Sequence, residues 1–135
     1  MKKRISKYTP GGYKLSVRRS LTGKGLFAEE DIPKGVCIIE YTGRVLSKEE
    51  NEDHGGKYLF EINKNKTIDG NIPSNRARYI NHSCTPNSEA IGTRDKMFIF
   101  SRKRIKAGTE LTYDYGKEYF NVFIKPNGCR CEKHR

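Results

Sequence analysis

The sequence is poor in hydrophobic residues and has no long apolar run. Hydrophobic residues make up 34% of the 135-residue chain, and charged residues make up 32%. No apolar stretch approaches the ~20 residues of a membrane-spanning helix, and none follows the basic N-terminus as it would in a secretory signal peptide. We therefore expect a soluble, intracellular protein without a membrane partner. Its length is near the commonest size of a single domain.

Cysteine and histidine are also scarce, with four and three residues respectively. A domain of this length buries roughly two thirds of its unfolded surface, so it needs no disulfide framework. Cys37 lies in an apolar run and is predicted to be a small buried residue. Cys129 and Cys131 are too close to pair with each other, and a C-x-C in an intracellular chain indicates a metal rather than a disulfide.

Long helical patterns are absent, which argues against a doubly wound parallel sheet. The Gly23–Gly25 segment lacks the full G-x-G-x-x-G spacing and the helix of a dinucleotide site, and we expect it to interrupt a strand. Ser47–Asp53 is the best helix candidate, because Ser47 can cap it together with Glu50. A hairpin is predicted around Thr93–Asp95. The segments with strand patterns are Tyr13–Arg18, Val36–Tyr41, Tyr58–Ile62, Thr67–Asp69, Ser88–Ile91, Met97–Ser101 and Glu110–Tyr113.

One short pattern occurs twice. Asp31–Gly35 (DIPKG) leads into the Val36–Tyr41 segment, and Arg104–Gly108 (RIKAG) leads into Thr109–Asp114. Both copies place an isoleucine three residues before a turn glycine that precedes a strand. Two copies do not make a solenoid. We interpret them as repeated turn chemistry in a compact, strand-rich domain.

The net charge of +11 is unevenly distributed. Two basic stretches flank an acidic stretch at residues 29–53. This arrangement fits either a weak, non-specific affinity for nucleic acid or another polyanion, or solvated ends that aid solubility. The basic residues are Lys2, Lys3, Arg4, Lys7, Lys14, Arg18 and Arg19 in the first stretch, and Arg102, Lys103, Arg104 and Lys106 in the second.

Chemically versatile side chains concentrate in Arg78–Asn87, which reads RYINHSCTPN. Cys84 with His82 and Asn87 has the residue types of a cysteine nucleophile. Such groups normally converge from distant parts of the chain, and a base two residues away does not easily reach the thiol in line. The nucleophile interpretation is therefore the weakest for this stretch.

A metal or a polar ligand suits the same stretch better. Asn81 and His82 offer donors and acceptors for a ligand such as a cofactor with an adenine or amino-acid end. The residues alone do not decide between such a clamp and a zinc-type site. In a zinc-type site Cys84 would act with three ligands from the C-terminus, Cys129, Cys131 and His134.

Several further motifs follow one another in a fixed order. ELTYDYG stands at Glu110–Gly116, after GKGLFA at Gly23–Ala28, EYTG at Glu40–Gly43, YLF at Tyr58–Phe60 and IDG at Ile68–Gly70. Together with RYINHSCTPN, this series resembles the SET-domain protein-lysine methyltransferases over roughly residues 13–131. The NHSC and ELTYDY motifs carry most of the specificity of the resemblance.

The resemblance implies a mainly β protein with the SET-domain β-clip fold, made of several small sheets with a C-terminal pseudoknot. In that fold the segment around Asn81–Cys84 threads through a loop that closes just before Tyr113–Tyr115. The resemblance divides the chain into a basic N-terminal arm at residues 1–12, a SET domain at 13–116 and a post-SET-like tail at 117–135. No cysteine-rich pre-SET region is present in this sequence.

The resemblance also implies the reaction, which is transfer of a methyl group from S-adenosylmethionine to a lysine amine, with S-adenosylhomocysteine as product. Gly23 and Gly25 would let the main chain approach the cofactor closely. Asn81 and His82 map to positions that hydrogen-bond the adenine and methionine ends. The full set of implied cofactor contacts is Tyr13, Gly23, Lys24, Gly25, Arg78, Asn81, His82 and Tyr115.

Three tyrosines receive catalytic roles from the resemblance. Tyr115 matches the tyrosine whose hydroxyl positions the amine and the methyl group, and Tyr58 matches a wall of the lysine channel. Tyr113 stands where the family has tyrosine or phenylalanine, and a hydroxyl there resembles the members that mono- or dimethylate. Without the ordered motifs, the same residues would be interpreted as ordinary core aromatics.

The resemblance further implies a structural zinc bound by Cys84 and the tail. The family's tail usually reads C-x-C-x4-C, whereas this chain has Cys129, Cys131 and then His134. The expected partner is a lysine-containing protein, either a histone or another basic or nucleic-acid-associated protein. A charge of +11 repels a basic tail unless the acidic stretch docks it or DNA is bound as well. The alternative is a catalytically weak SET-like or zinc-containing basic module that binds protein or nucleic acid.

Overall fold

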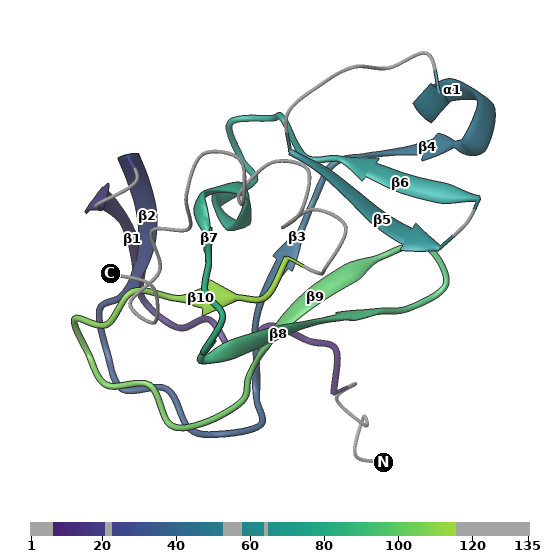
Figure 1. Ribbon diagram of the computed structural model, residues 1–135. Coiled ribbons are helices and arrows are strands. Elements are labelled where there is room, and N and C mark those ends of the chain that lie inside the picture. Colours follow the sequence, from purple (N-terminus) through teal and green to yellow (C-terminus); the bar gives the residue numbers. More distant parts are fainter. Residues whose placement is uncertain (1–6, 21–22, 53–57, 64, 116–135) are drawn as a thin grey trace.

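Short strands form four small sheets instead of one large sheet (Figure 1). The computed structural model describes residues 7–20, 23–52, 58–63 and 65–115, and the statements below concern those ranges. The sheets have the strand orders β1–β2, β3–β9–β8, β4–β6–β5 and β7–β10, and only the last is parallel among the described pairs. The strands are β1 (Leu15–Ser20), β2 (Gly23–Ala28), β3 (Cys37–Tyr41), β4 (Arg44–Ser47), β5 (Leu59–Asn63), β6 (Lys66–Asp69), β7 (Asn81–His82), β8 (Ser88–Gly92), β9 (Met97–Ser101) and β10 (Thr112–Tyr113).

Two short helices complete the described elements, and the sequence predicted the first of them. In α1 (Lys48–Glu52), the Ser47 hydroxyl accepts from the Glu50 amide at 3.2 Å, and the Glu50 carboxylate accepts from the Ser47 amide at 3.2 Å. This reciprocal capping box confirms the predicted helix start. The second helix is η1, a 3-10 helix at Arg76–Tyr79. Among the described residues, no helix has the length and apolar character to cross a membrane.

The predicted hairpin is confirmed, whereas the predicted break at Gly23–Gly25 is wrong. Strands β8 and β9 pair antiparallel around the Thr93–Asp95 turn. The Gly23–Gly25 segment instead belongs to β2, where it pairs with Arg18–Ser20 of β1. The glycines reduce strand propensity, but the cross-strand hydrogen bonds to β1 and the burial of Leu26 outweigh that preference.

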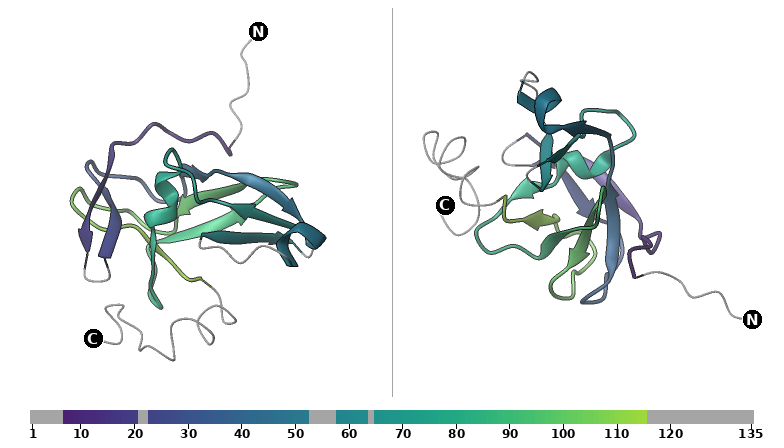
Figure 2. Two further views of the ribbon diagram at one scale, coloured as in Figure 1. Left: turned by 90° about the horizontal axis from the view of Figure 1, so that it is seen from above. Right: turned by 90° about the vertical axis from the view of Figure 1, so that its right-hand side faces the viewer.

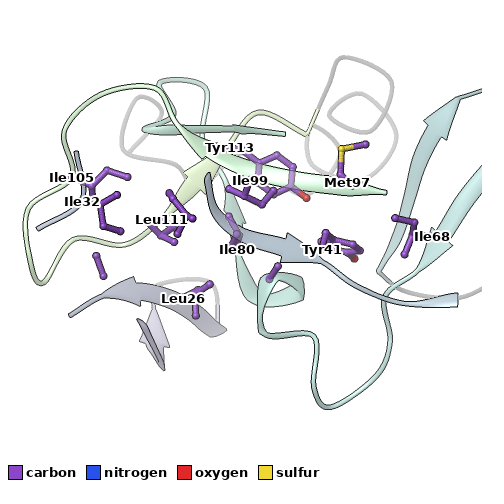
Figure 3. Packing of buried hydrophobic residues seen from close by; sticks show 13 residues of the cluster. Leu26, Ile32, Tyr41, Ile68, Ile80, Met97, Ile99, Ile105, Leu111 and Tyr113 are labelled. Carbon is purple, nitrogen blue, oxygen red and sulfur yellow. The ribbon is translucent and has the colours of Figure 1, made fainter. Parts of the chain in front are cut away.

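One hydrophobic core runs through the small sheets. All five residues of β9 are buried, and this strand lies between β3 and β8. Figure 3 shows the packed side chains as a row that begins at Ile32 and Ile105, passes Ile80, and ends at Ile68. Each fully buried aliphatic side chain contributes about 1.5–3 kcal/mol of transfer free energy. Since no single sheet is large enough to bury its own face, this shared core holds the four sheets together.

The two copies of the repeated turn pattern pair with each other. Ile32 and Ile105 form an isolated antiparallel bridge, in which each amide donates to the other residue's carbonyl at 2.8 and 2.9 Å. In Figure 1 and in both views of Figure 2, the two loops run side by side between β2 and β3 and between β9 and β10. The sequence predicted the turns, but it did not predict that they meet.

The parallel pair of β7 and β10 joins two segments that are distant in sequence. Asn81 is opposite Thr112, and His82 is opposite Tyr113. The side chain of the buried Asn87 holds the β10 segment in place. Its Nδ2 donates to the Glu110 carbonyl at 2.8 Å, and its Oδ1 accepts from the Thr112 main-chain amide at 2.9 Å. This is the juxtaposition that the predicted pseudoknot requires, and the mainly β fold of several small sheets is confirmed.

Candidate functional site

The candidate site forms where β7 meets β10. The Ser83 amide donates to the Tyr113 carbonyl at 3.1 Å, which extends the pairing beyond His82. The Tyr115 amide donates to Nδ1 of His82 at 3.1 Å, across 33 residues of sequence. The polar Asn81–His82 segment and the Tyr113–Tyr115 segment are therefore fixed to one another through their main chains. This crossing brings together four of the residues that the sequence predicted for the site.

Glu110 is a site residue that the sequence analysis missed. Its carboxylate accepts hydrogen bonds from Nδ2 of Asn81 at 2.7 Å and from Oγ of Ser20 at 2.9 Å. Nδ2 of Asn81 also donates to the Lys24 carbonyl at 3.0 Å. Glu110 thus orients the Asn81 amide and ties it to the end of the β1–β2 hairpin. The residue stands at the head of the ELTYDYG motif, but no local pattern indicates a partner 90 residues earlier.

The structure gives Gly25 a second reason to be glycine. A Cβ at Gly25 would overlap the Glu110 carboxylate, with the carboxyl carbon at 2.9 Å and the Cβ of Ser20 at 3.1 Å. Gly23 is different, because it has φ of +115° and a Cβ there would meet no atom within 4 Å. The sequence analysis explained both glycines by close approach of a cofactor. At Gly25, a neighbouring side chain already occupies the space that a Cβ needs.

The contacts of His82 indicate which of its ring nitrogens carries the proton. Because Nδ1 accepts the Tyr115 amide, the neutral ring carries its proton on Nε2. Nε2 lies 3.3 Å from Sγ of Cys84, so it donates to the sulfur. Oδ1 of Asp114 lies 3.8 Å from Nδ1, and the two side chains would form an ion pair only if the ring were doubly protonated. The ring is 6% exposed, and its hydrogen bonds hold it in one orientation.

This geometry corrects one step of the sequence argument about Cys84. The base two residues away does reach the thiol, contrary to expectation. It reaches the sulfur with the nitrogen that already carries the proton, so the neutral ring donates to sulfur and does not accept a proton from it. The cysteine-nucleophile interpretation remains disfavoured, but for this different reason.

Aromatic side chains surround Tyr115 and Tyr113. Their ring centroids lie 4.8 Å apart, and Phe60 stacks on Tyr113 at 5.7 Å. The Tyr115 hydroxyl donates to the Ile80 carbonyl, which precedes β7. Tyr113 is buried, whereas Tyr115 is partly exposed. Phe60 is a second neighbour that the sequence analysis did not assign to the site, although it lies in the matched YLF motif.

Tyr58 belongs to a second aromatic group with Tyr79 and Arg78. The rings of Tyr58 and Tyr79 meet edge to face at 6.4 Å, and the Arg78 guanidinium lies 5.4 and 4.7 Å from their centroids. Among the described residues, Tyr58 alone of the non-glycine residues has a positive φ, of 62°. Its carbonyl accepts from the Tyr41 hydroxyl at 2.8 Å and from the Gly70 amide at 2.9 Å. These bonds stabilise a backbone conformation that is unfavourable for an aromatic residue.

Arg78 is held in this group by several contacts. Nη1 donates to Oδ1 of Asn71 at 3.0 Å, and Nη2 donates to the Tyr79 hydroxyl at 2.6 Å. Nε is buried and has no hydrogen-bond partner among the described residues. Lys24 adds a second cation to the group, with its Nζ 5.5 Å from the Tyr79 ring. A ligand acceptor at Nε would satisfy a donor that is costly to leave unpaired.

Tyr13 and Lys24, two of the predicted cofactor contacts, mainly contact other parts of the domain. Tyr13 is partly buried and packs against the main core. Lys24 has an exposed side chain, and its carbonyl accepts from Asn81.

The prediction that Cys37 is a buried small residue is confirmed: it packs with Phe98 and Phe100, and burial raises the pKa of its thiol to about 11.

The predicted zinc site extends beyond the described ranges. Cys84 is partly exposed and lies at the end of the β7 segment. Within residues 7–115 as described, no group of three histidine, cysteine or acidic side chains could hold a metal ion. The other predicted ligands, Cys129, Cys131 and His134, lie outside the described residues.

The acidic stretch at residues 29–53 does not form one surface. Glu29, Glu30 and Asp31 follow β2, whereas α1 lies at the opposite end of the molecule (Figure 1). Several of these carboxylates already have partners in the chain. Arg18 lies 3.0 Å from Glu29, Glu30 accepts from the Lys14 amide at 2.7 Å, Arg104 lies 2.9 Å from Asp31, and Arg44 lies 2.9 Å from Glu50.

This chain is similar to known proteins in both sequence and fold. The model of the SET domain matches residues 23–116. Human histone-lysine N-methyltransferase 2D is 40% identical over 110 residues, which cover 73% of this chain and 2% of that protein. Histone-lysine N-methyltransferase ASHH3 of Arabidopsis thaliana is 38% identical over 122 residues, which cover 81% of this chain and 33% of the relative. The chain thus spans a third or less of these curated relatives.

Solved structures agree with the sequence comparisons. A humanized mutant of the Chaetomium thermophilum Polycomb Repressive Complex 2, bound to the inhibitor GSK126, matches with a TM-score of 0.68 and 33% identity. A structure of ctPRC2 in an autoinhibited conformation bound to S-adenosylmethionine matches with a TM-score of 0.67 and 32% identity. Each match covers 77% of this chain and 15% of the other chain.

Replacing Gly25 with alanine is expected to destabilise the chain by about 1–3 kcal/mol, as overpacking of a close contact does. The reason is that the added Cβ displaces the Glu110 carboxylate from Asn81 and Ser20. In a Glu110→Ala background the overlap is gone, so the same replacement should cost much less. Urea unfolding of the four proteins measures this as a double-mutant interaction energy of roughly 1 kcal/mol or more.

Gly92→Ala provides the matched control for this cycle. Its Cβ would meet the flexible end of Met97 at 3.2 Å and lies in a different sheet. Its cost should be the same with and without the Glu110 side chain. Additive effects of Gly25→Ala and Glu110→Ala would contradict the proposed contact.

Proposed function

The chain belongs to the SET-domain family, and from this membership we propose that it is a protein-lysine N-methyltransferase that uses S-adenosylmethionine. The observation that carries the proposal is the β7–β10 crossing. It fixes Asn81 and His82, the family's cofactor positions, beside Tyr113 and Tyr115. The relatives named above are histone-lysine methyltransferases, which supports the same reaction class.

The residues of the site fit this cofactor. Glu110 orients the Asn81 side chain, and the Tyr115 amide and the Cys84 sulfur hold the His82 ring, so the segment that would bind the cofactor has a defined conformation. Nε of Arg78, which has no hydrogen-bond partner among the described residues, offers a buried donor to a carboxylate or hydroxyl acceptor. Gly23, Lys24 and Tyr13 would line the same region from the β1–β2 hairpin and the segment before it. When bound, the cofactor supplies an electrophilic methyl group on its sulfonium.

The chain's own part in the reaction is to position and desolvate the lysine amine. Aromatic walls around Tyr113, Tyr115 and Phe60 exclude water, which lowers the pKa of a lysine from ~10.4 and favours the neutral, nucleophilic amine. Tyr58 would form a further wall of the channel. The bond from the Tyr115 hydroxyl to the Ile80 carbonyl holds that ring in place. Most of the rate enhancement should come from this positioning.

We propose a lysine-containing protein that is bound to nucleic acid as the substrate, with histones as one class, in the interior of the cell. The carboxylates that could attract a free basic tail are divided between two ends of the molecule, and several already have partners. A net charge of +11 favours a target whose own charge is neutralised. The second candidate is a non-catalytic SET-like module. The presence of Asn81, His82 and Tyr115 at the family's cofactor and catalytic positions favours the enzyme, since an inactive relative could lose these residues.

Incubation with radiolabelled S-adenosylmethionine tests the activity. We expect label on lysines of histones, ribosomal proteins or lysate proteins, and a loss of about a hundredfold or more in rate for Tyr115→Phe, as when one positioned hydroxyl donor is removed. Tyr8→Phe is the matched control, because Tyr8 packs against Phe98 and Phe100 away from the crossing. The enzyme proposal fails if no label is transferred and calorimetry detects no binding of S-adenosylmethionine.

Tyr113→Phe is expected to change the degree of methylation. We propose that the Tyr113 hydroxyl holds a water that limits room around the amine, so that the parent protein stops at one or two methyl groups. Without the hydroxyl, mass spectrometry of the modified peptide should show a shift toward higher methylation. Phe60 stacks on the same ring, and Phe60→Leu controls for a general loosening of the pocket. An unchanged product distribution would remove this role from Tyr113.

We also propose a structural zinc bound by Cys84 with Cys129, Cys131 and His134. The contact of Nε2 of His82 with the Cys84 sulfur at 3.3 Å would hold that sulfur in place as a ligand. Protein purified without added zinc should contain about one equivalent by elemental analysis, as a four-ligand structural site requires. Cys84→Ser should lower that content, while Cys37→Ser should leave it unchanged. Less than a tenth of an equivalent in the parent protein would rule out the site.

A further inference from the structure

The paired turns carry a cluster of exposed cations that the proposed methyl transfer does not use. The two turns are residues 31–36, between β2 and β3, and residues 102–109, between β9 and β10. Within them only Ile32 and Ile105 are buried, at 0% and 1% exposure, and these anchor the turns in the core. We call the exposed cations of both turns, apart from Arg104, the basic tip, which comprises Lys34, Arg102, Lys103 and Lys106.

Main-chain hydrogen bonds make the tip a rigid scaffold. Besides the Ile32–Ile105 bridge, the Gly35 amide donates to the Ser101 carbonyl at 2.9 Å, and the Arg102 amide donates to the Asn87 carbonyl at 2.8 Å. The Ser101 hydroxyl donates to the Pro33 carbonyl at 2.6 Å. The cations therefore project from a surface whose backbone is already ordered, so binding a ligand costs little backbone entropy.

Asp31, the acidic residue of the first turn, is hydrogen-bonded to the second turn. Oδ1 of Asp31 accepts from the Ala107 amide at 2.9 Å, and Oδ2 pairs with Arg104 at 2.9 Å. The Ala107 amide and then Arg104 hold the pKa of Asp31 below its ordinary value, so it stays ionised and engaged. Arg104 is committed to this pair. Among the described residues, no salt bridge joins the four cations of the basic tip to an acidic side chain, although the charge of Lys106 also helps to lower the pKa of Asp31.

We propose that the basic tip binds the phosphate backbone of double-stranded DNA. Exposed cations that have no salt bridge to an acidic side chain among the described residues, on a surface with an ordered backbone, are suited to the negative charges of a duplex backbone. Neither turn contains an aromatic residue, and stacking on aromatic rings is the usual basis of single-strand binding. The tip therefore suits a duplex backbone read by charge, without base specificity.

The connection from the tip to the candidate site is short. The second turn ends at Thr109, and the next residue is Glu110, which orients Asn81. Figure 1 places the tip at the end of the molecule opposite α1 and the β4–β6–β5 sheet. DNA bound at the tip would hold the molecule close to proteins on the same duplex and neutralise their basic tails. The inference concerns binding and stands whether or not methyl transfer is observed.

Fluorescence anisotropy with a labelled 20-base-pair duplex tests the inference on the full chain without cofactor or substrate. The tip variant replaces Lys34, Arg102 and Lys106 with glutamine, which keeps the Asp31–Arg104 pair intact. The matched control replaces the exposed Lys48, Arg94 and Lys96 with glutamine, so that both variants lose two lysines and one arginine. Circular dichroism melts check that both variants fold.

We expect the tip variant to bind the duplex about tenfold or more weakly than the control variant at ~0.1 M salt. The slope of log K against log salt should also be shallower by roughly 2 to 3, since about 0.9 is lost for each phosphate contact removed. Equal binding by the two variants would overturn the proposal. Equally tight, tip-dependent binding of a single-stranded RNA of the same length would overturn the choice of duplex DNA.

Discussion

Two residues of parallel pairing bring the candidate site together. Asn81 and His82 lie against Thr112 and Tyr113, and within the described part of the chain no third strand joins this sheet. So short a ladder is unstable by itself. Its stability comes from side chains that close around it, above all the buried amide of Asn87, which binds the chain on both sides of Leu111. The site therefore exists only when the tertiary fold is complete.

The same dependence links stability to chemistry. Glu110 binds the hairpin through Ser20 and the crossing through Asn81, so one carboxylate couples the first strands of the domain to the last. His82 binds Tyr115 with one nitrogen and Cys84 with the other. These residues stabilise the crossing by the same hydrogen bonds that orient them for a ligand. A loss of packing far from the site would thus also disturb the orientation of the Asn81 and His82 side chains.

Local rules predicted the local elements of this fold. The Ser47–Glu50 cap and the hairpin around Thr93–Asp95 were found from the sequence because each depends on neighbours a few residues apart. The role of Gly25 was predicted incompletely because its neighbour Glu110 lies 85 positions away. Glu110 itself was missed because its partners Ser20 and Asn81 lie 90 and 29 positions away. The pairing of Ile32 with Ile105 was missed for the same reason. At Tyr58, Tyr113 and Tyr115, residue type alone would have indicated an ordinary core, and only the ordered motifs suggested the proposed catalytic roles.

The bridge between the two turns has a consequence for how the chain can change over time. Surface connections usually tolerate insertions and deletions, because nothing fixes their length. Here each turn is the hydrogen-bonding partner of the other, and the second turn runs directly into Glu110. A residue gained or lost in either turn would break the match and shift the start of β10. We therefore expect these turns to accept exchange of exposed side chains but not insertions or deletions.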